Sequence, residues 1–402
     1  MEPHPSAIRR RALPGSIWAL GIVSLLMDTS SELVHSLLPI LMSSVLGASV
    51  ATIGLIEGLA QATAAVGKVF SGAISDYFRK RKILVLLGYG LAAFTKPVFP
   101  LANSIGWVFA ARFVDRIGKG IRGAPRDALV ADLVPPEMRG AAYGLRQALD
   151  SVGAFAGPLL AVVFMALLAD DIRAVLWIAV VPAFLCVALI VFGVREPADA
   201  KSAAPRKRLA FADARRLPSR YWLVVALGAV FTLARFSEAF LILRAQNVGL
   251  AIGFVPLIMI AMNVVYSACA YPAGAAADRV APRTLLLAGL GMLIAADALL
   301  AAAASPMGAF IGAGFWGLHM AFTQGLLTKL VADAAPAEMR GTAFGVFHLV
   351  SGGALLLASV IAGTLWSRLG PAATFIAGAA FAAVAAAGLL FFRPRAASAP
   401  AP

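Results

Sequence analysis

Charged side chains recur at steps of three and four within one otherwise apolar stretch, residues 105–133. On a helix that turns about 100° per residue, they fall within an arc of roughly 120°. Five bases and one acid give this face a net charge of 5 − 1 = +4. Such a face cannot lie against an apolar medium, so it must meet water, an anionic molecule or carboxylates. The six residues are Arg112, Asp115, Arg116, Lys119, Arg122 and Arg126.

Carboxylates that could pair with these bases occur in other apolar stretches. Asp28, Glu32 and His35 follow one another at steps of four and three, so they share one helix face. A buried carboxylate beside bases can take up and release a proton, because burial favours its neutral form and the bases favour its charged form. Asp28 and Glu32 are the first candidates for proton coupling, and Glu57, Asp150 and Glu238 are the next. The competing interpretation is an ion-pair network that only holds helices in register.

Other polar side chains on these stretches are candidates for contact with a small molecule. The first half offers His35, Arg112, Arg116, Lys119, Arg122 and Arg146. The second half is much poorer in charge and offers Arg235, Asn263, Tyr266, His319 and Gln324.

No cofactor or metal site is expected. The chain lacks the phosphate-binding pattern G-x-x-x-x-G-K-[ST], and it lacks G-x-S-x-G and H-E-x-x-H. Met259, Met262 and the pair His319–Met320 are soft metal ligands by type, but no dense run of His and Met occurs. The acids are interleaved with arginines, which repel cations. These observations argue against an enzyme and against metal transport.

Composition identifies the elements that position these residues. Of 402 residues, 61% are hydrophobic and 13% are charged, whereas soluble domains carry about 45–50% and about 25%. The chain is therefore expected to be an integral membrane protein. In a soluble protein the formal charge of +14 would suggest nucleic acid, but here the bases lie between apolar runs, so no nucleic-acid partner is expected.

The apolar runs predict an all-α membrane protein with about twelve spanning helices, because about 20 residues cross a bilayer. The helices are expected near residues 17–45, 50–76, 83–102, 105–133, 140–168, 173–194, 220–245, 251–277, 284–303, 307–333, 341–366 and 370–392. Lys and Arg gather between alternate helices, as in "RKRK" at 79–82. This asymmetry places both termini on the cytoplasmic side of the inner (plasma) membrane.

A segment rich in Pro, Ala and charge, residues 195–219, divides six predicted helices from six. The expected organisation is a cytoplasmic tail (1–16), a six-helix bundle (17–194), a cytoplasmic linker (195–219), a second six-helix bundle (220–392) and a tail (393–402).

Two segments in the first half have near-copies in the second. "ADLVPPEMRGAAYG" begins at Ala131 and "ADAAPAEMRGTAFG" at Ala332; "GAISDYFRKRK" begins at Gly72 and "GAAADRVAPRT" at Gly274. A weaker echo pairs "SSE" at 30–32 with "FSE" at 236–238. The first two pairs are separated by 332 − 131 = 201 and 274 − 72 = 202 positions, which predicts a tandem repeat of one six-helix unit. Parallel repeats of this kind place a substrate path between the halves, near the membrane midplane.

With these features the chain resembles the major facilitator superfamily of secondary transporters over essentially its whole length. That family's loop between its second and third helices reads G-x-x-x-D-[RK]-x-G-[RK]-[RK]. The first copy matches at Gly72, Asp76, Lys80 and Arg81 and departs at Tyr77 and Arg79; the second keeps Gly274, Asp278, Arg279 and Arg283.

Two further motifs carry the resemblance. Arg116, Gly120 and Gly123 fit the pattern R-x-x-x-G-x-x-G of the family's fourth helix. The pattern G-x-x-x-G-P-x-x-G marks the fifth helix of many of its proton antiporters; Gly153, Gly157 and Pro158 fit it, and Ala161 replaces the last glycine. The second motif favours export.

The resemblance implies that the doubled loop residues latch the two halves together in one conformation. Gly72 would let two helix backbones approach closely, and Asp76 could accept hydrogen bonds from the N-terminal amides of another helix. Lys80 and Arg81 would hold the loop at an anionic leaflet. A local helix cap without a switching role is the alternative.

The sequence therefore predicts a secondary active transporter, proton-coupled, that moves a small organic molecule by alternating access, with efflux favoured. Proton-driven uptake of an organic anion is the alternative, motivated by the basic face of 105–133. A membrane lipid enzyme should carry its charges at headgroup level, and a transporter-like sensor usually adds a soluble domain, so both are less favoured. The expected partners are the small molecule, protons and the lipid bilayer, and the chain is expected to be a monomer.

Overall fold

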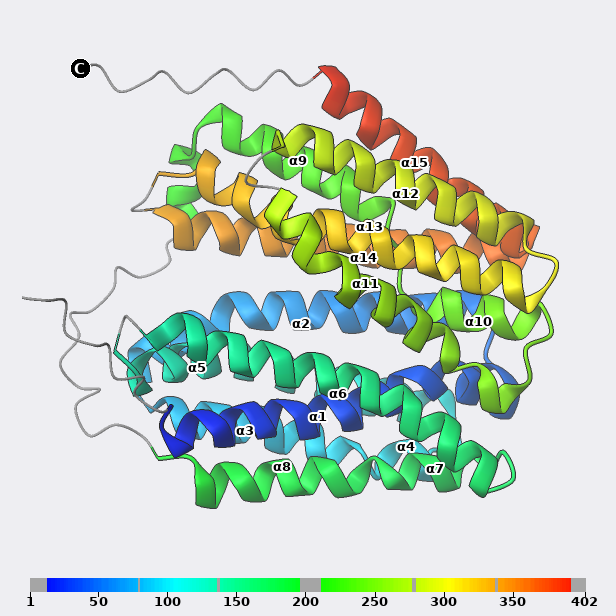
Figure 1. The fold of residues 1–402 in the computed structure, drawn as a ribbon, viewed down its shortest axis with the longest axis horizontal. Helices are drawn as coiled ribbons and strands as arrows, with labels where there is room; N and C mark the ends of the chain where they lie inside the picture. Colours follow the sequence, from blue (N-terminus) through cyan, green and yellow to red (C-terminus); the bar gives the residue numbers. More distant parts are fainter. Residues whose placement is uncertain are drawn as a thin grey trace, which may run out of the picture.

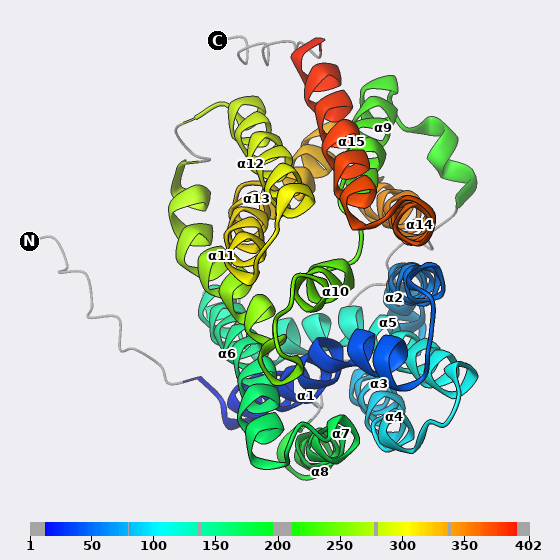
Figure 2. The same cartoon turned by 90° about the vertical axis from the view of Figure 1, so that its right-hand side faces the viewer.

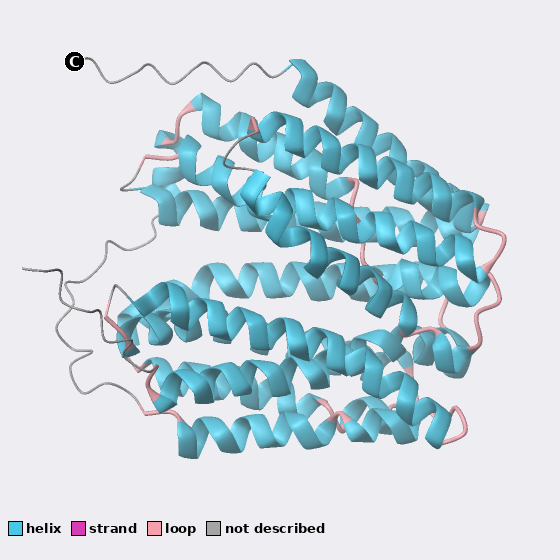
Figure 3. Cartoon of the chain, viewed as in Figure 1, coloured by secondary structure: helices cyan, strands magenta, loops and turns pink. Residues whose placement is uncertain are grey.

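The computed structural model describes residues 13–78, 80–135, 138–195, 211–276, 280–336 and 339–391. Every regular element within these ranges is helical and none is a strand (Figure 3). Nine of the helices described there are long and apolar enough to cross a membrane. The all-α membrane fold predicted from composition is therefore confirmed.

The first half contains eight α-helices, because two predicted spans are each divided. Its elements are α1 (Gly15–Ile40) with the π-helical turn η1 (Leu41–Val45), α2 (Val50–Phe78), α3 (Arg81–Thr95), α4 (Val98–Leu101), α5 (Ile105–Leu133), α6 (Arg139–Leu167), α7 (Ile172–Ile178) and α8 (Val180–Gly193). The division between α3 and α4 falls at Lys96 and Pro97, where proline has no backbone N–H to continue the ladder.

The second half begins after the 3₁₀ turn η3 (Phe211–Arg216). Its elements are α9 (Ser219–Leu233), α10 (Ala239–Asn247), the 3₁₀ turn η4 (Ile252–Phe254), α11 (Leu257–Ala276), α12 (Pro282–Ala302), α13 (Pro306–Ala334), α14 (Arg340–Leu369) and α15 (Pro371–Phe391). The span predicted at 220–245 is not continuous, because Ala234–Glu238 leaves the helix between α9 and α10. Ser237 stabilises this break, since its hydroxyl accepts the Ala239 N–H at 3.3 Å.

The two halves form two helical bundles, α1–α8 and α9–α15, that lie one above the other in Figure 1. Corresponding helices repeat at one offset: α5 and α13 begin at Ile105 and Pro306 and end at Leu133 and Ala334, each 201 positions apart. The residues before them, Ser104 and Ser305, share the same backbone angles, φ −147° and ψ 160°. The tandem repeat read from the sequence is thus a repeat of structure.

The halves join along α2 and α14, and where α10 packs on α1 and α11 packs on α6 (Figure 2). A Cβ atom at Gly363 would lie 2.8 Å from the Val50 carbonyl oxygen, so α14 meets α2 backbone to backbone. We call the side of the molecule where α1 ends and α2 begins the far end, and the side where α8 ends and α9 begins the linker end. Two hydrogen bonds connect the halves at the far end: Gln246 Nε2 to Ser44 Oγ at 2.7 Å, and the Ala51 N–H to Ser367 Oγ at 3.0 Å.

Candidate functional site

Helix α5 carries the charged row, and its glycines fix where that row points. A Cβ atom at Gly118 would lie 2.5 Å from the Gly88 carbonyl oxygen, and one at Gly120 would lie 2.8 Å from the Gly67 Cα. Helix α5 therefore lies against the backbones of α3 and α2. This close packing brings its bases within reach of side chains from α1, α2, α3 and α6.

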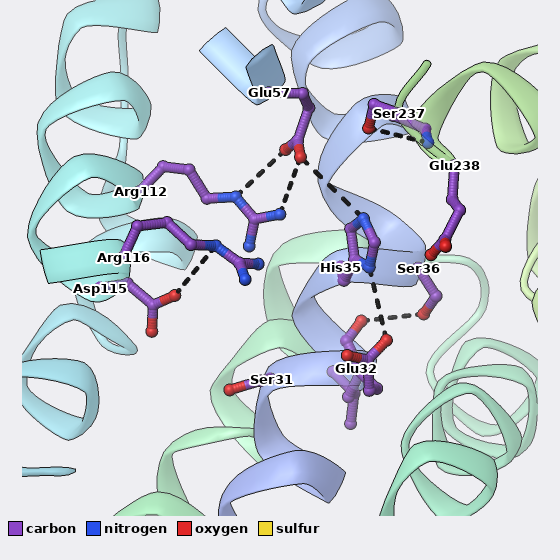
Figure 4. Close-up of polar contacts among 12 residues, drawn as sticks. Ser31, Glu32, His35, Ser36, Glu57, Arg112, Asp115, Arg116, Ser237 and Glu238 are labelled. Atoms are coloured by element: carbon purple, nitrogen blue, oxygen red, sulfur yellow. Dashed lines mark hydrogen bonds and ion pairs between the residues drawn. The ribbon is translucent and has the colours of Figure 1, made fainter. Parts of the chain in front are cut away.

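A fully buried ion pair connects α2 to α5. The Arg112 guanidinium donates through Nε and Nη2 to the two carboxylate oxygens of Glu57, at 3.1 and 2.9 Å. His35 of α1 lies next to the pair, with Nε2 4.0 Å from Glu57 Oε2 and Nδ1 3.4 Å from Glu32 Oε2 (Figure 4). One imidazole ring thus lies between two carboxylates that are 25 positions apart (57 − 32) in the sequence.

A second buried pair connects the α3–α4 break to α5. The Lys96 ammonium donates to Asp115 Oδ1 at 3.0 Å and to Ser31 Oγ at 3.1 Å. Arg116 approaches the same carboxylate, with Nε 3.7 Å from Asp115 Oδ2. Lys96 was not among the site residues expected from the sequence, although a lysine within an apolar run was the signal that could have identified it.

Asp28 and Glu32 lie where α6 packs closely against α1. A Cβ atom at Gly153 would lie 3.0 Å from Asp28 Cβ, and one at Gly157 would lie 2.8 Å from Glu32 Cβ. The two glycines of the expected fifth-helix motif are therefore the residues that permit α6 to contact α1 beside both acids.

These two acids face the remaining bases of the row. Asp28 lies in the electrostatic field of Asp150, Lys119 and Arg122. Glu32 lies in that of His35, Lys119 and Arg116, and its side chain keeps 23% of its surface exposed. Neither carboxylate has a bidentate partner of the kind that Glu57 has.

The cluster continues towards the linker end. Arg146 donates to Asp150 Oδ2 at 2.6 Å within α6. The Arg126 guanidinium donates to the Tyr89 hydroxyl at 3.3 Å and to Asp127 Oδ1 at 3.2 Å.

Several of these bases retain unused hydrogen-bond donors among the described residues. Arg116 Nε, Arg122 Nη1 and Arg146 Nε are buried and have no hydrogen-bond partner, and Arg122 lies over the Tyr89 ring at 4.4 Å. Lys119 is exposed. The cluster's bases are Lys96, Arg112, Arg116, Lys119, Arg122, Arg126 and Arg146, and its acids are Asp28, Glu32, Glu57, Asp115, Asp127 and Asp150. With all of them charged, seven minus six leaves an excess of +1.

The second half contributes fewer polar groups. Arg235 and Glu238 form an ion pair of 3.5 Å at the break between α9 and α10, and Glu238 extends from the break towards α1 (Figure 4). His319 is fully buried, donates through Nδ1 to the Gly289 carbonyl at 2.8 Å and stacks on Phe231. Asn263 and Tyr266 are partly buried on α11, and the Gln324 side chain lies outside the described residues.

The expected latch residues are described only in part. Asp278 and Arg279 lie outside the described residues. Gly72, Asp76 and Gly274 are described only as parts of their helices. Lys80 is exposed. Arg81 pairs with Asp132 and donates to the Ala128 carbonyl at 2.8 Å, and Arg283 donates to the Leu390 carbonyl. Each of these described contacts joins helices of the same half.

Two helical bundles related by an internal repeat, with a buried charge cluster in one of them, are the architecture of a polytopic membrane transporter. The sequence model of the Major Facilitator Superfamily matches residues 20–243 and 236–402. The chain belongs to the Major Facilitator Superfamily, as its motifs indicated.

Individual relatives support the same family. An uncharacterised MFS-type transporter of Methanocaldococcus jannaschii is 32% identical over 390 residues, covering 95% of this chain and 96% of that protein. The multidrug resistance protein MdtH of Citrobacter koseri is 32% identical over 108 residues, covering 27% of each chain. A crystal structure of a D-xylose–proton symporter superposes with a TM-score of 0.74 at 17% identity, covering 94% of this chain and 98% of that one, which is a likeness of fold.

Proposed function

We propose that the protein is a proton-coupled secondary active transporter that moves a small organic molecule by alternating access, with efflux as the favoured direction. The observation that carries the proposal is the position of Asp28 and Glu32. These two acids on one face of α1 are contacted by α6 through glycines and face bases of α5 that keep free hydrogen-bond donors. We place the protein in the plasma membrane with both termini in the cytoplasm, following the positive-inside rule.

Proton coupling at this site follows from the balance of charge. Protonating one acid raises the excess charge of the cluster from +1 to +2, and releasing the proton lowers it again. The change falls beside Lys119, Arg116 and Arg122, so it alters what these bases can bind. Efflux is supported by the fifth-helix glycines and by the partial likeness to the multidrug resistance protein; symport is how the D-xylose–proton symporter is named.

The test uses the full chain in proteoliposomes that contain a trapped pH-sensitive dye, with a panel of cationic, neutral and anionic organic compounds. A compound that is carried should move protons in the wild type. Asp28→Asn or Glu32→Gln should abolish this proton movement and leave exchange of labelled for unlabelled compound intact. If both variants still move protons with the compound, neither acid carries the coupling proton, and Glu57, Asp150 and Glu238 are tested next.

Asp171→Asn is the matched control, because it makes the same chemical change outside the cluster. Asp171 caps α7 by accepting the N–H groups of Arg173 and Ala174, and asparagine caps about as well. Proton movement in this variant should equal that of the wild type.

Proton-driven uptake of an organic anion is the second candidate, and the unused donors of Arg116, Arg122 and Arg146 favour it. In this case Arg116→Lys should weaken binding of anionic compounds by about 10- to 100-fold, because lysine keeps the charge but loses the planar fork that binds carboxylate or phosphate. Its thermal stability should stay near that of the wild type. Preferential transport of cations, unchanged by Arg116→Lys, would contradict anion binding; loss of stability alone would make Arg116 a structural partner of Asp115.

A further inference from the structure

The apolar half of the molecule contains a buried acid that the transport site does not use. Asp297 lies on α12, five residues before Ala302 at the end of that helix, and its residue is 0% exposed. Neither carboxylate oxygen has a hydrogen-bond partner among the described residues. Every acid of the first-half cluster, by contrast, has a base within its electrostatic reach.

The walls around Asp297 are apolar and tightly packed. Gly378 of α15 leaves the space that the carboxylate occupies, because a Cβ atom there would lie 2.5 Å from Asp297 Oδ2 and 3.0 Å from Phe236 Cε1. Phe236 in turn contacts the rings of Trp316 and Phe375, with centroids 5.3 and 5.6 Å away. An ionised carboxylate in such surroundings is far more costly than a protonated one.

No countercharge faces Asp297 from the elements packed around it, within the part of the chain that the structure describes. Helix α15 has no ionisable residue between Pro371 and Phe391. On α13, His319 is bonded to the Gly289 carbonyl. Between α9 and α10, Arg235 and Glu238 pair with each other. On α10, Arg244 donates to the carbonyls of Leu300, Ala301 and Ala303 at the end of α12.

The internal repeat identifies the nearest counterpart of this site. Asp297 and Trp316 lie 201 positions after Lys96 and Asp115 (297 − 96 and 316 − 115), the same offset that relates α5 to α13. Lys96 and Asp115 meet at 3.0 Å. The second half thus keeps the same junction of two helices but replaces the ion pair by a carboxyl and an indole. Trp316 Nε1 is a buried donor that also lacks a partner.

The junction lies beside a discontinuity in the backbone. Phe236 packs against Trp316 and lies beside Gly378, as the Asp297 carboxyl does. It belongs to the unwound segment Ala234–Glu238 between α9 and α10. Unwound segments in transporter helices accompany ion sites, and they can change conformation without disrupting a helical ladder. A shift of Phe236 would change the surroundings of the Trp316 indole on which it packs.

We propose that Asp297 is a proton-binding site of the second half: it holds a proton in this conformation and releases it when movement at the α9–α10 break brings its carboxylate to Trp316 Nε1. Uptake forms one O–H bond on a carboxylate oxygen with a proton from water, and release returns that proton to water while the indole N–H donates to the carboxylate. The link between this proton and a transport cycle rests on the function proposed above; the binding of the proton itself does not.

Infrared difference spectroscopy of the full chain in lipid tests the binding step without any transported compound. The wild type at neutral pH should show the carbonyl band of a protonated carboxylic acid that is absent from Asp297→Asn, a nearly isosteric replacement for the neutral acid. Asp171→Asn, which changes an acid that caps α7 away from both sites, should retain the band. If Asp297→Asn leaves the band intensity unchanged, Asp297 carries no proton and the proposal fails.

Trp316→Phe provides a second readout that does not depend on the folding of Asp297→Asn. It keeps the acid and the apolar packing but removes the donor, so the band should persist to a higher pH than in the wild type. If the band of Trp316→Phe is lost at the same pH as that of the wild type, Trp316 is not the partner of the carboxylate.

The role in the cycle has its own measurement. Spin labels on α6 and α14 at the linker end should report a pH-dependent distance distribution in the wild type, and Asp297→Asn should abolish the part of the response that follows titration of the band. If Asp297→Asn loses the band but its spin-label distances respond to pH as those of the wild type do, the link between this proton and conformation is overturned. Failure of the proposed function itself appears elsewhere, as unchanged proton movement in Asp28→Asn and Glu32→Gln, so the two failures are distinguishable.

Discussion

At the scale of single residues, the charge cluster divides into members that are fully paired and members that are not. Glu57 and Arg112 satisfy each other in a bidentate arrangement, and Lys96 and Asp115 do so through one short contact. Arg116, Arg122 and Arg146 keep buried nitrogens without partners. The fully paired members hold α2, α5 and the α3–α4 break together, and the free donors of Arg116, Arg122 and Arg146 are available to a ligand.

The Glu57–Arg112 pair should be costly to break from one side. Arg112→Ala should destabilise the protein by about 3–5 kcal/mol, because it leaves the Glu57 carboxylate buried without a countercharge. Replacing both residues, as in Glu57→Leu with Arg112→Met, should recover most of that loss, since an apolar pair of similar volume avoids desolvation of two charges. Thermal unfolding in detergent ranks the stabilities of the wild type, Arg112→Ala and the double variant. A double variant no more stable than Arg112→Ala would show that the loss comes from packing rather than from an unpaired charge.

At the scale of elements, glycines determine which helices meet and breaks determine which segments can move. Gly118 and Gly120 let α5 pack closely on α3 and α2, and Gly363 lets α14 pack closely on α2. The sequence identified the charged row from spacing and the fifth-helix glycines from the resemblance to the family. It did not identify the break at Ala234–Glu238, because this segment has neither glycine nor proline and lies between two apolar runs. It also did not identify which acid pairs with which base, since that depends on how closely helices distant in the sequence approach each other.

The contact between α14 and α2 offers a direct test on one helix. Gly363→Ala should destabilise this conformation by about 1–3 kcal/mol, because the added methyl group would lie 2.8 Å from the Val50 carbonyl oxygen. Gly353→Ala on the same helix meets no atom within 4 Å and should be neutral or slightly stabilising. Thermal unfolding and spin-label distances between α2 and α14 at the far end measure both effects. Equal behaviour of the two variants would contradict backbone-to-backbone packing.

The latch expected from the doubled loop motif stays a prediction. Asp76→Asn should shift the population between forms open at either end of the molecule, because a neutral side chain accepts weaker hydrogen bonds from a helix N-terminus than a carboxylate does. Spin-label distances at both ends measure the populations. Asp171→Asn, the same chemical change at a helix cap outside the motif, is the control and should leave the populations unchanged. Identical populations in wild type and Asp76→Asn would count against the latch.

At the scale of the whole molecule, the two halves share one architecture but differ in the buried polar side chains that they carry. The first half holds the ion pairs, while the equivalent junction of the second half holds Asp297 and Trp316. The halves are joined by hydrogen bonds at the far end, between Gln246 and Ser44 and between Ala51 and Ser367. Movement of one bundle against the other must break these contacts.

A covalent link at the far end should therefore stop transport. Cysteines at positions 44 and 246, in a background where Cys186 and Cys269 are replaced by alanine, should form a disulfide or a short chemical cross-link, because the native side chains approach to 2.7 Å. Proton movement in proteoliposomes should be lost on oxidation and restored on reduction. Cysteines at positions 16 and 195, which adjoin within the first half, are the control and should leave activity intact. Full activity of the cross-linked 44–246 protein would exclude opening at the far end.

The unequal distribution of charge has an electrical consequence. A voltage across the membrane acts on a buried charge with about 2.3 kcal/mol per elementary charge per 100 mV. Most of the buried charge in the described chain belongs to α1, α2, α5, α6 and the α3–α4 break, whereas Arg244 is the buried base of the second half. With all its groups charged the first-half cluster carries +1, and a proton on Asp28 or Glu32 makes it +2. The proposed coupling therefore predicts that protonation doubles the force of the field on the first bundle, so the membrane potential should act most strongly on the protonated state.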